Sequence, residues 1–414
     1  MISKSSVLYV WIWLPKEVKP VVAGVIQQSG DSLVFAYGKS YLNRKEAVPI
    51  FIDELPLVSG PQEPKPPKRL AGCLRDGAPD SWGRHVILNR LYGDDSREMD
   101  TGDESELVFL RESGSDRIGR LDFQDSPTEY VARQNSATLD ELHSAVQMLQ
   151  NNIPLPAGLA EALQHGTAIG GARPKSLLNG RDKKYIAKFS SSTDTYPLVK
   201  YEFLSMRLAA ACGLNVAEVS LTQSIGRDVL LVERFDRHWH NGGWCRRGVV
   251  SALTVLDLDE MEAPYASYSN FAQWLRANSD QPKVDLRELF SRLIFNILCG
   301  NTDDHARNHA VFCEQGYVRL TPAYDICPQL RTGGEATQGM SIYEGQRLSQ
   351  LVHCIGAANY FLLSAPEARA IAEQQIQVIE TEWHTIADEA ALSKTDRSML
   401  WRRQLLNPFA MEGF

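Results

Sequence analysis

Several features that would define a secreted, zinc-stabilised or membrane protein are missing from this 414-residue sequence. Its seven cysteines are scattered, odd in number and form no C-x-x-C pair, which argues against a disulfide framework and a structural zinc site. No run reaches the roughly 18–20 apolar residues of a membrane span. The apolar start, Val7–Leu14, is short and has no small-residue cleavage site. Together these absences predict a soluble, cytoplasmic protein with reduced thiols.

An excess of positive charge is also missing. The chain has 43 Lys and Arg against 51 Asp and Glu, a formal net charge of −8. A protein that binds nucleic acid by itself usually has a basic surface. We therefore expect this chain to reach DNA only through a basic partner.

The composition that remains is that of an ordinary globular protein, long enough for two or three domains. Alternating apolar and polar residues predict short strands near the start, and further strands follow later in the chain. The expected strands are Val7–Trp13, Ser32–Tyr37, Ser176–Leu178, Lys184–Phe189, Val229–Val232, Ala310–Phe312 and Tyr317–Leu320. Residues 1–130 are expected to form a small α+β domain.

Helical periodicity and end signals predict five helices, most of them late in the chain. Asp80 or Ser81 is placed to cap the first, within Asp76–Tyr92, and Thr138 with Glu141 forms a capping box for the second. The others are Pro197–Cys212, a strongly periodic helix over Leu286–Leu298 that ends at Gly300, and one from Ser364 to about Trp383. A strand-rich half is thus followed by a helical half.

The segment Asn301–Asn308 follows the buried-looking helix and has the spacing of a kinase catalytic loop. In such a loop an Asp accepts the proton of the substrate hydroxyl, and an Asn five residues later binds magnesium. This spacing pairs Asp303 with Asn308. Taken alone, the segment could also be an Asp-rich turn between helices, because Asp and Asn are common in loops.

A second carboxylate, Asp325, follows the strand pair that comes after this loop. A hard cation such as Mg²⁺ takes oxygen ligands, and a carboxylate from a separate loop would complete the set. A plain turn aspartate is the alternative. The order of the two segments, with a strand pair between them, favours phosphoryl transfer more strongly than either segment alone.

Three further features fit nucleotide binding. Gly166–Lys175 is glycine-rich, so its backbone could approach phosphates closely, although a common turn would look similar. Lys188 lies in an apolar strand, and Glu202 on the next helix could form the kinase lysine–glutamate pair. Glu233 and Phe235 follow the next strand, where a connector between lobes could contact adenine.

Taken together, these motifs resemble the HipA-type serine/threonine-protein kinase toxins of bacterial toxin–antitoxin systems. The resemblance covers nearly the whole chain. It is carried by Gly170–Lys175, Ile186–Phe189, Glu202 within Val199–Val216, Ser251–Thr254 through Trp274, Val232–Arg237, Asn301–Asn308 and Pro322–Asp325, with Pro79–Arg84 and Arg117–Arg120 in the N-terminal domain. It implies an α+β, protein-kinase-like bilobal fold, with an N-terminal subdomain over 1–130, a strand-rich ATP lobe over 131–245 and a helical catalytic lobe over 246–414.

The resemblance also implies roles, a cofactor set and partners. Asp303 would be the catalytic base, Asn308 and Asp325 would hold magnesium, and Lys188 would bind the ATP phosphates. The nucleotide-binding set would be Gly170, Gly171, Ala172, Lys188, Glu202, Glu233, Phe235 and Asp236. The implied partners are a helix-turn-helix, HipB-like antitoxin, through which the chain would reach DNA, and a protein substrate such as an aminoacyl-tRNA synthetase, whose phosphorylation arrests growth.

One position departs from the family pattern. Family members often carry an autophosphorylated serine in the glycine-rich loop, and the matching residue here is Ala168, which has no hydroxyl. Its neighbour Thr167 has one. We therefore expect regulation to depend on the partner or on Thr167. Mass spectrometry after incubation with ATP would exclude Thr167 if it found no phosphate there or nearby.

Two other classes of function stay open. A small-molecule phosphotransferase would share the catalytic residues, although such an enzyme has no need of the N-terminal module. A non-catalytic scaffold would keep the fold as a partner-binding or repressor module, and the absence of the loop serine favours it. Phosphorylation of small alcohols would indicate the first, and ATP binding without turnover the second.

Overall fold

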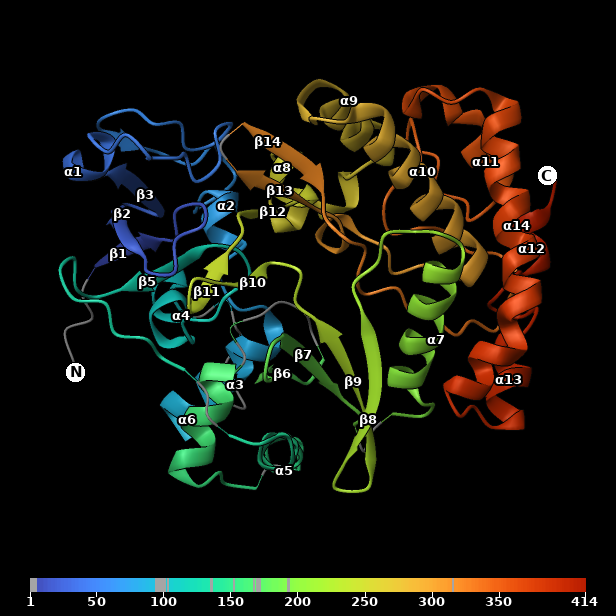
Figure 1. Cartoon of the computed structure of the whole chain (residues 1–414), viewed down its shortest axis with the longest axis horizontal. Helices are drawn as coiled ribbons and strands as arrows, with labels where there is room; N and C mark the ends of the chain where they lie inside the picture. Colours follow the sequence, from blue (N-terminus) through green and yellow to red (C-terminus); the bar gives the residue numbers. More distant parts are fainter. Residues whose placement is uncertain are drawn as a thin grey trace. The chain divides into compact units, whose positions relative to one another are not determined.

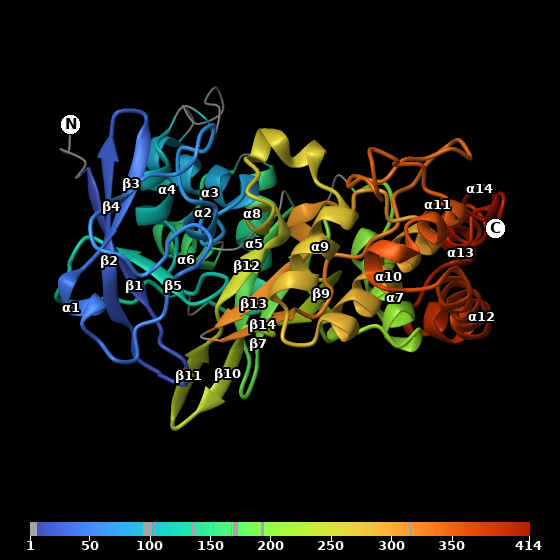
Figure 2. The ribbon, with the colours of Figure 1, turned by 90° about the horizontal axis from the view of Figure 1, so that it is seen from above.

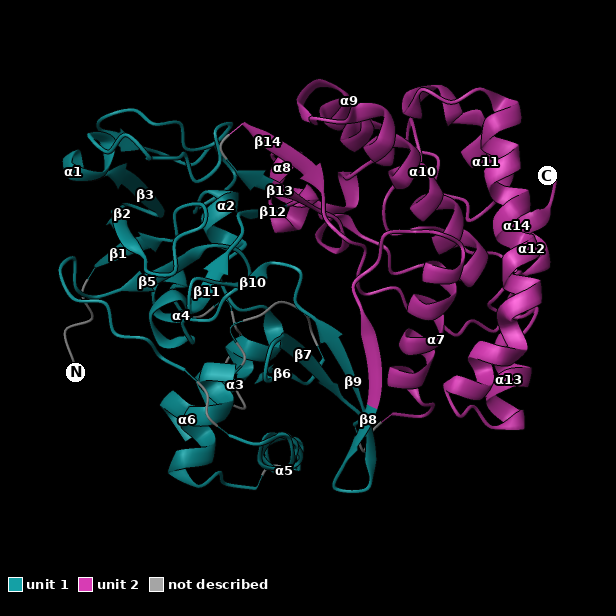
Figure 3. Cartoon of the chain, viewed as in Figure 1, with its two compact units in different colours: residues 1–192, 222–250, 313–315 teal, residues 193–221, 251–312, 316–414 magenta. Residues whose placement is uncertain are grey.

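The computed structural model describes residues 6–93, 102, 104–134, 137–151, 153–166, 168, 173–191, 194–314 and 316–414. The chain forms two compact units, coloured separately in Figure 3. Unit 1 comprises Met1–Ser192, Thr222–Val250 and Cys313–Gln315, and unit 2 comprises Thr193–Leu221, Ser251–Phe312 and Gly316–Phe414. The division into 1–130, 131–245 and 246–414 stays a prediction.

Unit 1 begins with a five-stranded sheet in the order β4-β3-β2-β1-β5 (Figures 1 and 2). Its strands are β1 (Val7–Ile12), β2 (Val21–Ser29), β3 (Ser32–Tyr37), β4 (Pro61–Gln62) and β5 (Leu121–Gln124). All paired neighbours are antiparallel, and the register of β1 on β2 shifts between Val10 and Trp11. The two strands predicted near the start are confirmed as β1 and β3.

The described part of unit 1 contains six helices, three of which contribute to one apolar core. They are α1 (Lys39–Leu42), α2 (Gly72–Arg75), α3 (Ser81–Tyr92), α4 (Glu106–Glu112), α5 (Leu139–Gln150) and α6 (Ala157–Gly166). Trp82 of α3, Leu142 of α5 and Leu163 of α6 are buried in one cluster with Phe189. The predicted capping box of Thr138 and Glu141 is present, and Asp80 occupies the N-cap position of α3.

A four-stranded sheet has the order β6-β7-β9-β8, from β6 (Lys175–Asn179), β7 (Lys184–Phe189), β8 (Val219–Ser224) and β9 (Arg227–Glu233). Strand β7 lies between β6 and β9, antiparallel to both, so that Lys188 pairs with Lys175 on one side and Leu230 on the other. The three strands predicted here are confirmed as β6, β7 and β9. The hairpin of β10 (Arg237–His240) and β11 (Gly243–Arg246) follows.

Unit 2 is mainly helical. Its elements are α7 (Leu198–Ala211), α8 (Ala252–Val255), η2 (Glu260–Tyr265), α9 (Tyr268–Asn278), α10 (Pro282–Cys299), η3 (Ala306–Asn308), α11 (Leu351–Gly356), η4 (Ala358–Phe361), α12 (Ala365–Glu389), α13 (Lys394–Leu400) and α14 (Pro408–Met411). Helix α12 packs on both α7 and α10, as Figures 1 and 2 show. The predicted helices are confirmed as α7, α10 and α12, and Ser364 caps α12 with a capping box.

A three-stranded sheet of β12 (Val249–Ser251), β13 (Ala310–Glu314) and β14 (Tyr317–Leu320) completes the secondary structure. The strand pair predicted after the segment Asn301–Asn308 is confirmed as β13 and β14. All seven cysteines are free thiols. Within the described ranges, no helix combines the length and apolar character needed to cross a bilayer.

Candidate active site

The loop Asn301–Asn308 starts where α10 ends. Gly300 adopts a left-handed conformation, with φ +74°, which reverses the chain after the last helical turn. The Asn301 backbone N–H donates to the Asn296 carbonyl at 2.9 Å, and the Asn301 side chain donates to the Asn296 side chain at 3.0 Å. A buried helix therefore fixes the first residue of the loop.

The structure brings Asp303, Asn308 and Asp325 together in unit 2. The Asn308 side-chain nitrogen lies 3.5 Å from the Asp303 carbonyl oxygen, and Asp325 is close enough for its charge to act on the Asp303 carboxyl. The hydroxyl of Tyr324 donates to the Arg307 carbonyl at 2.8 Å, tying the segment before Asp325 to the loop. Asp325 itself has φ +61°, an unusual conformation for a non-glycine residue.

Electrostatics distinguish Asp303 from an ordinary surface aspartate. Its side chain reaches solvent, but desolvation by the surrounding atoms raises its pKa, and the negative charges of Asp325 and Asp304 raise it further while His305 lowers it. Like charges held close together disfavour ionisation of both groups. A divalent cation between two such carboxylates would relieve this repulsion.

The donor set fits magnesium. In the parts of the chain that are described, no group of three His, Cys, Asp or Glu residues could hold a metal by itself. Asp325 and Asn308 instead offer one carboxylate and one amide oxygen, since the hydrogen bond from Asn308 to the Asp303 carbonyl uses the amide nitrogen. Mg²⁺ is commonly bound through one or two carboxylates and completes its shell with phosphate oxygens and water.

A buried hydrogen-bond network under the loop was not predicted. The Asp304 carboxylate, only 1% exposed, accepts from the Tyr268 hydroxyl and, at 2.9 Å, from His309 Nε2. The Asn296 side chain donates to the Tyr268 oxygen at 3.3 Å, which links this network to Asn301. Burial and the Asp304 charge raise the pKa of Tyr268 well above its usual range. Tyr268 lies more than 30 residues before the loop in sequence, and no local pattern predicts its contact with Asp304.

Hydrogen bonds to backbone carbonyls hold the loop residues Thr302 and Asp304 and the segment before Asp325. The N–H groups of Gly339 and Met340 donate to the carbonyls of Thr302 and Asp304 at 3.1 and 3.0 Å. A Cβ on Gly339 would lie 2.6 Å from the Asp304 carbonyl oxygen, so only glycine permits this approach. The buried Arg292 of α10 donates to the Thr321 carbonyl at 2.7 Å, four residues before Asp325.

The residues predicted to bind nucleotide are distributed over both units. Lys188 is partly buried on β7 in unit 1, and Glu202 is buried on α7 in unit 2. Ala168 is buried. Four residues of the glycine-rich loop lie outside the described part of the chain: Thr167, Gly170, Gly171 and Ala172. Their roles in nucleotide binding and regulation stay predictions.

Strand β9 of unit 1 ends at Glu233, and Phe235 and Asp236 follow it beside a buried cluster of charges. The side chains of Asp236 and Arg234 pair at 2.9 Å, and Asp236 also pairs with Arg237 at 2.8 Å. Against the effect of burial, the charges of Arg234 and Arg237 lower the pKa of Asp236. Glu233 pairs with Lys183, and Phe235 is partly buried. The carboxylate of Asp236 thus forms ion pairs inside unit 1. Its place in the nucleotide-binding set and the adenine contacts of Glu233 and Phe235 stay predictions.

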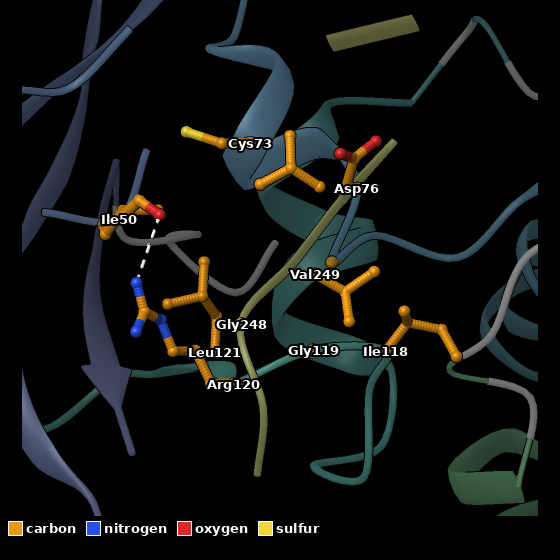
Figure 4. Close-up of a pocket in the computed structure, with 11 residues that line it drawn as sticks. Ile50, Cys73, Asp76, Ile118, Gly119, Arg120, Leu121, Gly248 and Val249 are labelled. Atoms are coloured by element: carbon orange, nitrogen blue, oxygen red, sulfur yellow. Dashed lines mark hydrogen bonds between the residues drawn. The ribbon is translucent and has the colours of Figure 1, made fainter. Parts of the chain in front are cut away.

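Unit 1 also contains a small cavity, shown in Figure 4, that is lined by Ile50, Cys73, Ile118 and Val249 among others. Arg120 at its edge donates to the carbonyls of Pro49 and Ile50. The cavity volume is about 10 Å³. That is enough for roughly one water molecule and far below the roughly 300 Å³ of a small ligand site.

Comparison with protein families gives two matches. The model for the HipA-like C-terminal domain matches residues 167–383, and the model for the HipA N-terminal domain matches residues 14–124. The first covers the candidate catalytic loop, Asp325 and Lys188. The second lies within the predicted N-terminal subdomain.

Three individual relatives have sequence identities between 25% and 28%. A candidate kinase of Sinorhizobium fredii, Y4mE, is 25% identical over 330 residues, covering 74% of each chain. A candidate kinase of Haemophilus influenzae is 27% identical over 183 residues, which are 39% of this chain and 53% of that protein. The serine/threonine-protein kinase toxin HipA of Shewanella oneidensis is 28% identical over 185 residues, which are 38% of this chain and 42% of that protein.

The fold has a clear likeness among solved structures. A chain in the complex of Shewanella oneidensis HipA, HipB and operator DNA matches with a TM-score of 0.67 at 18% identity, covering 96% of this chain and 95% of that chain. At this identity the likeness concerns the fold alone. It confirms the predicted α+β, protein-kinase-like architecture.

Proposed function

Because the chain belongs to the HipA family, we propose that it is an ATP- and magnesium-dependent serine/threonine protein kinase acting as the toxin of a toxin–antitoxin pair. The observation that supports this most directly is the gathering of Asp303, Asn308 and Asp325 in unit 2. Phosphoryl transfer depends mainly on positioning and charge neutralisation, and these three side chains have the types that both tasks require.

Each residue has a distinct proposed role. Asp303 accepts the proton of the substrate hydroxyl, because it is the accessible carboxylate of the loop. Asn308 and Asp325 hold magnesium through oxygen atoms, and the bound ion would neutralise charge on the phosphates. Lys188 binds the phosphates, with Glu202 orienting it. The buried network of Asp304, Tyr268 and His309 holds the loop in one conformation.

The partner proposals follow the family. A HipB-like, helix-turn-helix antitoxin is supported by the likeness to a chain from a complex that contains HipA, HipB and operator DNA. Contact with DNA would then be indirect, in keeping with the net charge of −8. An aminoacyl-tRNA synthetase is the substrate that the family resemblance suggests.

Phosphoproteomics tests the kinase proposal. Cells producing this chain are compared with cells producing an Asp303→Asn variant. Loss of a general base typically costs 10²–10⁴ in rate, so we expect the chain-dependent phosphosites to disappear in the variant. Asp388→Asn is the matched control, since Asp388 is an exposed carboxylate on α12. Identical phosphosite profiles for the wild type and Asp303→Asn would contradict the proposal.

Asp325→Asn tests the metal role separately. Removing one negative charge from the magnesium site should weaken nucleotide binding when Mg²⁺ is present, and should have less effect when it is absent. Isothermal titration with ATP, with and without Mg²⁺, measures the difference. Equal loss of affinity in both conditions would contradict a metal-binding role for Asp325.

A further inference from the structure

Two large apolar side chains on unit 2 are unusually exposed. Met261 is 85% exposed and Tyr265 is 76% exposed, the highest values among the large hydrophobic residues that the structure describes. They lie four residues apart on η2, between α8 and α9, and none of the residues of η2 is buried. These side chains therefore contribute little to the core. Large apolar side chains that are this exposed, and this near each other in sequence, can mark an interaction site.

The η2 segment has a fixed conformation. Asp259 accepts from the Met261 N–H at 3.0 Å, and the Asp259 N–H donates to the Glu262 side chain at 2.9 Å, which together form a capping box. At the other end, the Ala266 N–H donates to the Ala263 carbonyl at 3.1 Å. Met261 and Tyr265 are thus presented from an ordered backbone, which lowers the entropic cost of binding a partner.

Both ends of η2 are tied to the catalytic loop. At one end, Glu260 forms an ion pair with Arg307, which precedes Asn308. At the other, Arg347 donates to the Pro264 carbonyl and also to the carbonyl of Gly339. Gly339 in turn donates to the Thr302 carbonyl at 3.1 Å. The exposed pair therefore belongs to the same hydrogen-bonded frame as Asp303.

The charged side chains of the η2 segment itself are all acidic, although Arg307 and Arg347 contact it from elsewhere in unit 2. Asp257, Asp259, Glu260 and Glu262 lie within six residues, and no Lys or Arg occurs between Arg247 and Arg276. Arg307 pairs with Glu260, but the surface keeps an excess of carboxylates. Such a surface attracts a basic partner and repels an acidic one.

We propose that the surface formed by Met261 and Tyr265 binds the segment of the protein substrate that carries the acceptor hydroxyl. This inference rests on the proposed kinase function and names the chemistry that its site selects. The preferred segment is an extended peptide with a bulky apolar residue that covers Met261 and Tyr265. In this substrate peptide, one or more Lys or Arg residues lie beside the acceptor Ser or Thr and face the carboxylates of η2.

A peptide library tests the inference. The probe is a positional-scanning set of synthetic peptides with a fixed central Ser or Thr, phosphorylated with labelled ATP by the full-length chain. We expect the wild type to prefer a bulky apolar residue at one position and Lys or Arg nearby. The double variant Met261→Ser/Tyr265→Ser should lose the apolar preference, with a fall in kcat/KM on the best peptide of roughly tenfold for each side chain.

Two further variants sharpen the test. Glu262→Gln removes a charge but keeps a residue that can complete the capping box, and it should weaken only the preference for Lys and Arg. Val284→Ser is the matched control, because Val284 is 54% exposed on α10 of the same unit, and it should leave the preference unchanged. Melting curves show whether each variant is folded.

The possible failures are distinguishable. Wild-type labelling no greater than that of Asp303→Asn would overturn the proposed kinase function, and this inference with it. Clear labelling with the same preferences in the wild type and the double variant would overturn the inference alone. Unchanged preferences combined with an altered oligomeric state in the double variant would also overturn it, because the surface would then be a contact between copies of this chain.

Discussion

At the residue scale, two consecutive aspartates have different surroundings. Asp303 reaches solvent, and nearby charges and desolvation raise its pKa, whereas Asp304 is buried and accepts from Tyr268 and His309. Their sequence context is the same, so the division of roles depends on residues that the fold brings from elsewhere. The structure thus leaves Asp303 accessible for the proposed chemistry, whereas Asp304 is buried in the hydrogen bonds that hold the loop.

Substitution of each aspartate by asparagine should separate these roles. Asp304→Asn replaces a buried charged acceptor and points an N–H at one donor, which we expect to lower the free energy of unfolding by about 1.5–3 kcal/mol. Asp303→Asn should change stability by less than about 0.5 kcal/mol, as for a typical exposed site, while it abolishes phosphorylation. Urea unfolding and a phosphorylation assay measure both effects. Equal destabilisation by the two substitutions would contradict this division.

At the element scale, the end of α10 determines where the candidate catalytic loop, Asn301–Asn308, begins. Sequence alone predicted that α10 stops at Gly300, because the apolar period ends there and glycine favours a left-handed conformation. The structure adds a second reason that sequence could not supply. A Cβ on Gly300 would lie 2.8 Å from the Gln404 carbonyl oxygen, a contact between positions more than 100 residues apart. Backbone strain and close packing therefore act together at this residue.

Gly300→Ala should be more harmful than Gly316→Ala. Both glycines have positive φ, +74° and +67°, so each alanine introduces about 1–2 kcal/mol of left-handed strain. A Cβ on Gly316 would meet nothing within 4 Å, whereas a Cβ on Gly300 would also collide with Gln404. We expect Gly300→Ala to reduce both stability and phosphorylation and Gly316→Ala to reduce stability alone, as measured by urea unfolding and a phosphorylation assay. Similar losses of activity in both variants would contradict the role of the α10 end.

At the scale of the whole molecule, sequence predicted local elements better than long-range contacts. The strands β7 and β9 and the helices α7, α10 and α12 follow from periodicity and end signals, whereas the roles of Asp303, Asn308 and Asp325 stay predictions. The network through Tyr268 and the placement of η2 beside the loop depend on tertiary packing. Neither has a periodic pattern or a motif in the sequence, so neither could be predicted.

Buried ion pairs in unit 1 make the free energy of unfolding of the chain depend on pH. Asp122 accepts from Arg117 and Arg133, both at 2.9 Å. Burial opposes its ionisation, yet the charges of Arg133 and Arg117 lower its pKa from 3.8 to about 2. Asp116 and Asp236 are shifted in the same direction by Arg234 and Arg237. A carboxylate with a lowered pKa in the folded state stabilises the protein above its unfolded pKa and loses this contribution as pH falls.

We therefore expect the free energy of unfolding to fall steeply below about pH 4, with Asp122 alone contributing about 2 kcal/mol of the loss by pH 2 or lower. Asp122→Asn should be less stable at neutral pH, by about 3–5 kcal/mol, because Arg117 is left buried without its partner. Its pH dependence between about pH 4 and pH 2 should be shallower than that of the wild type. Asp125→Asn is the control, since the Asp125 side chain is 61% exposed. Urea unfolding across this range, followed by tryptophan fluorescence, gives both slopes, and equal slopes for the wild type and Asp122→Asn would show that this pair does not govern acid stability.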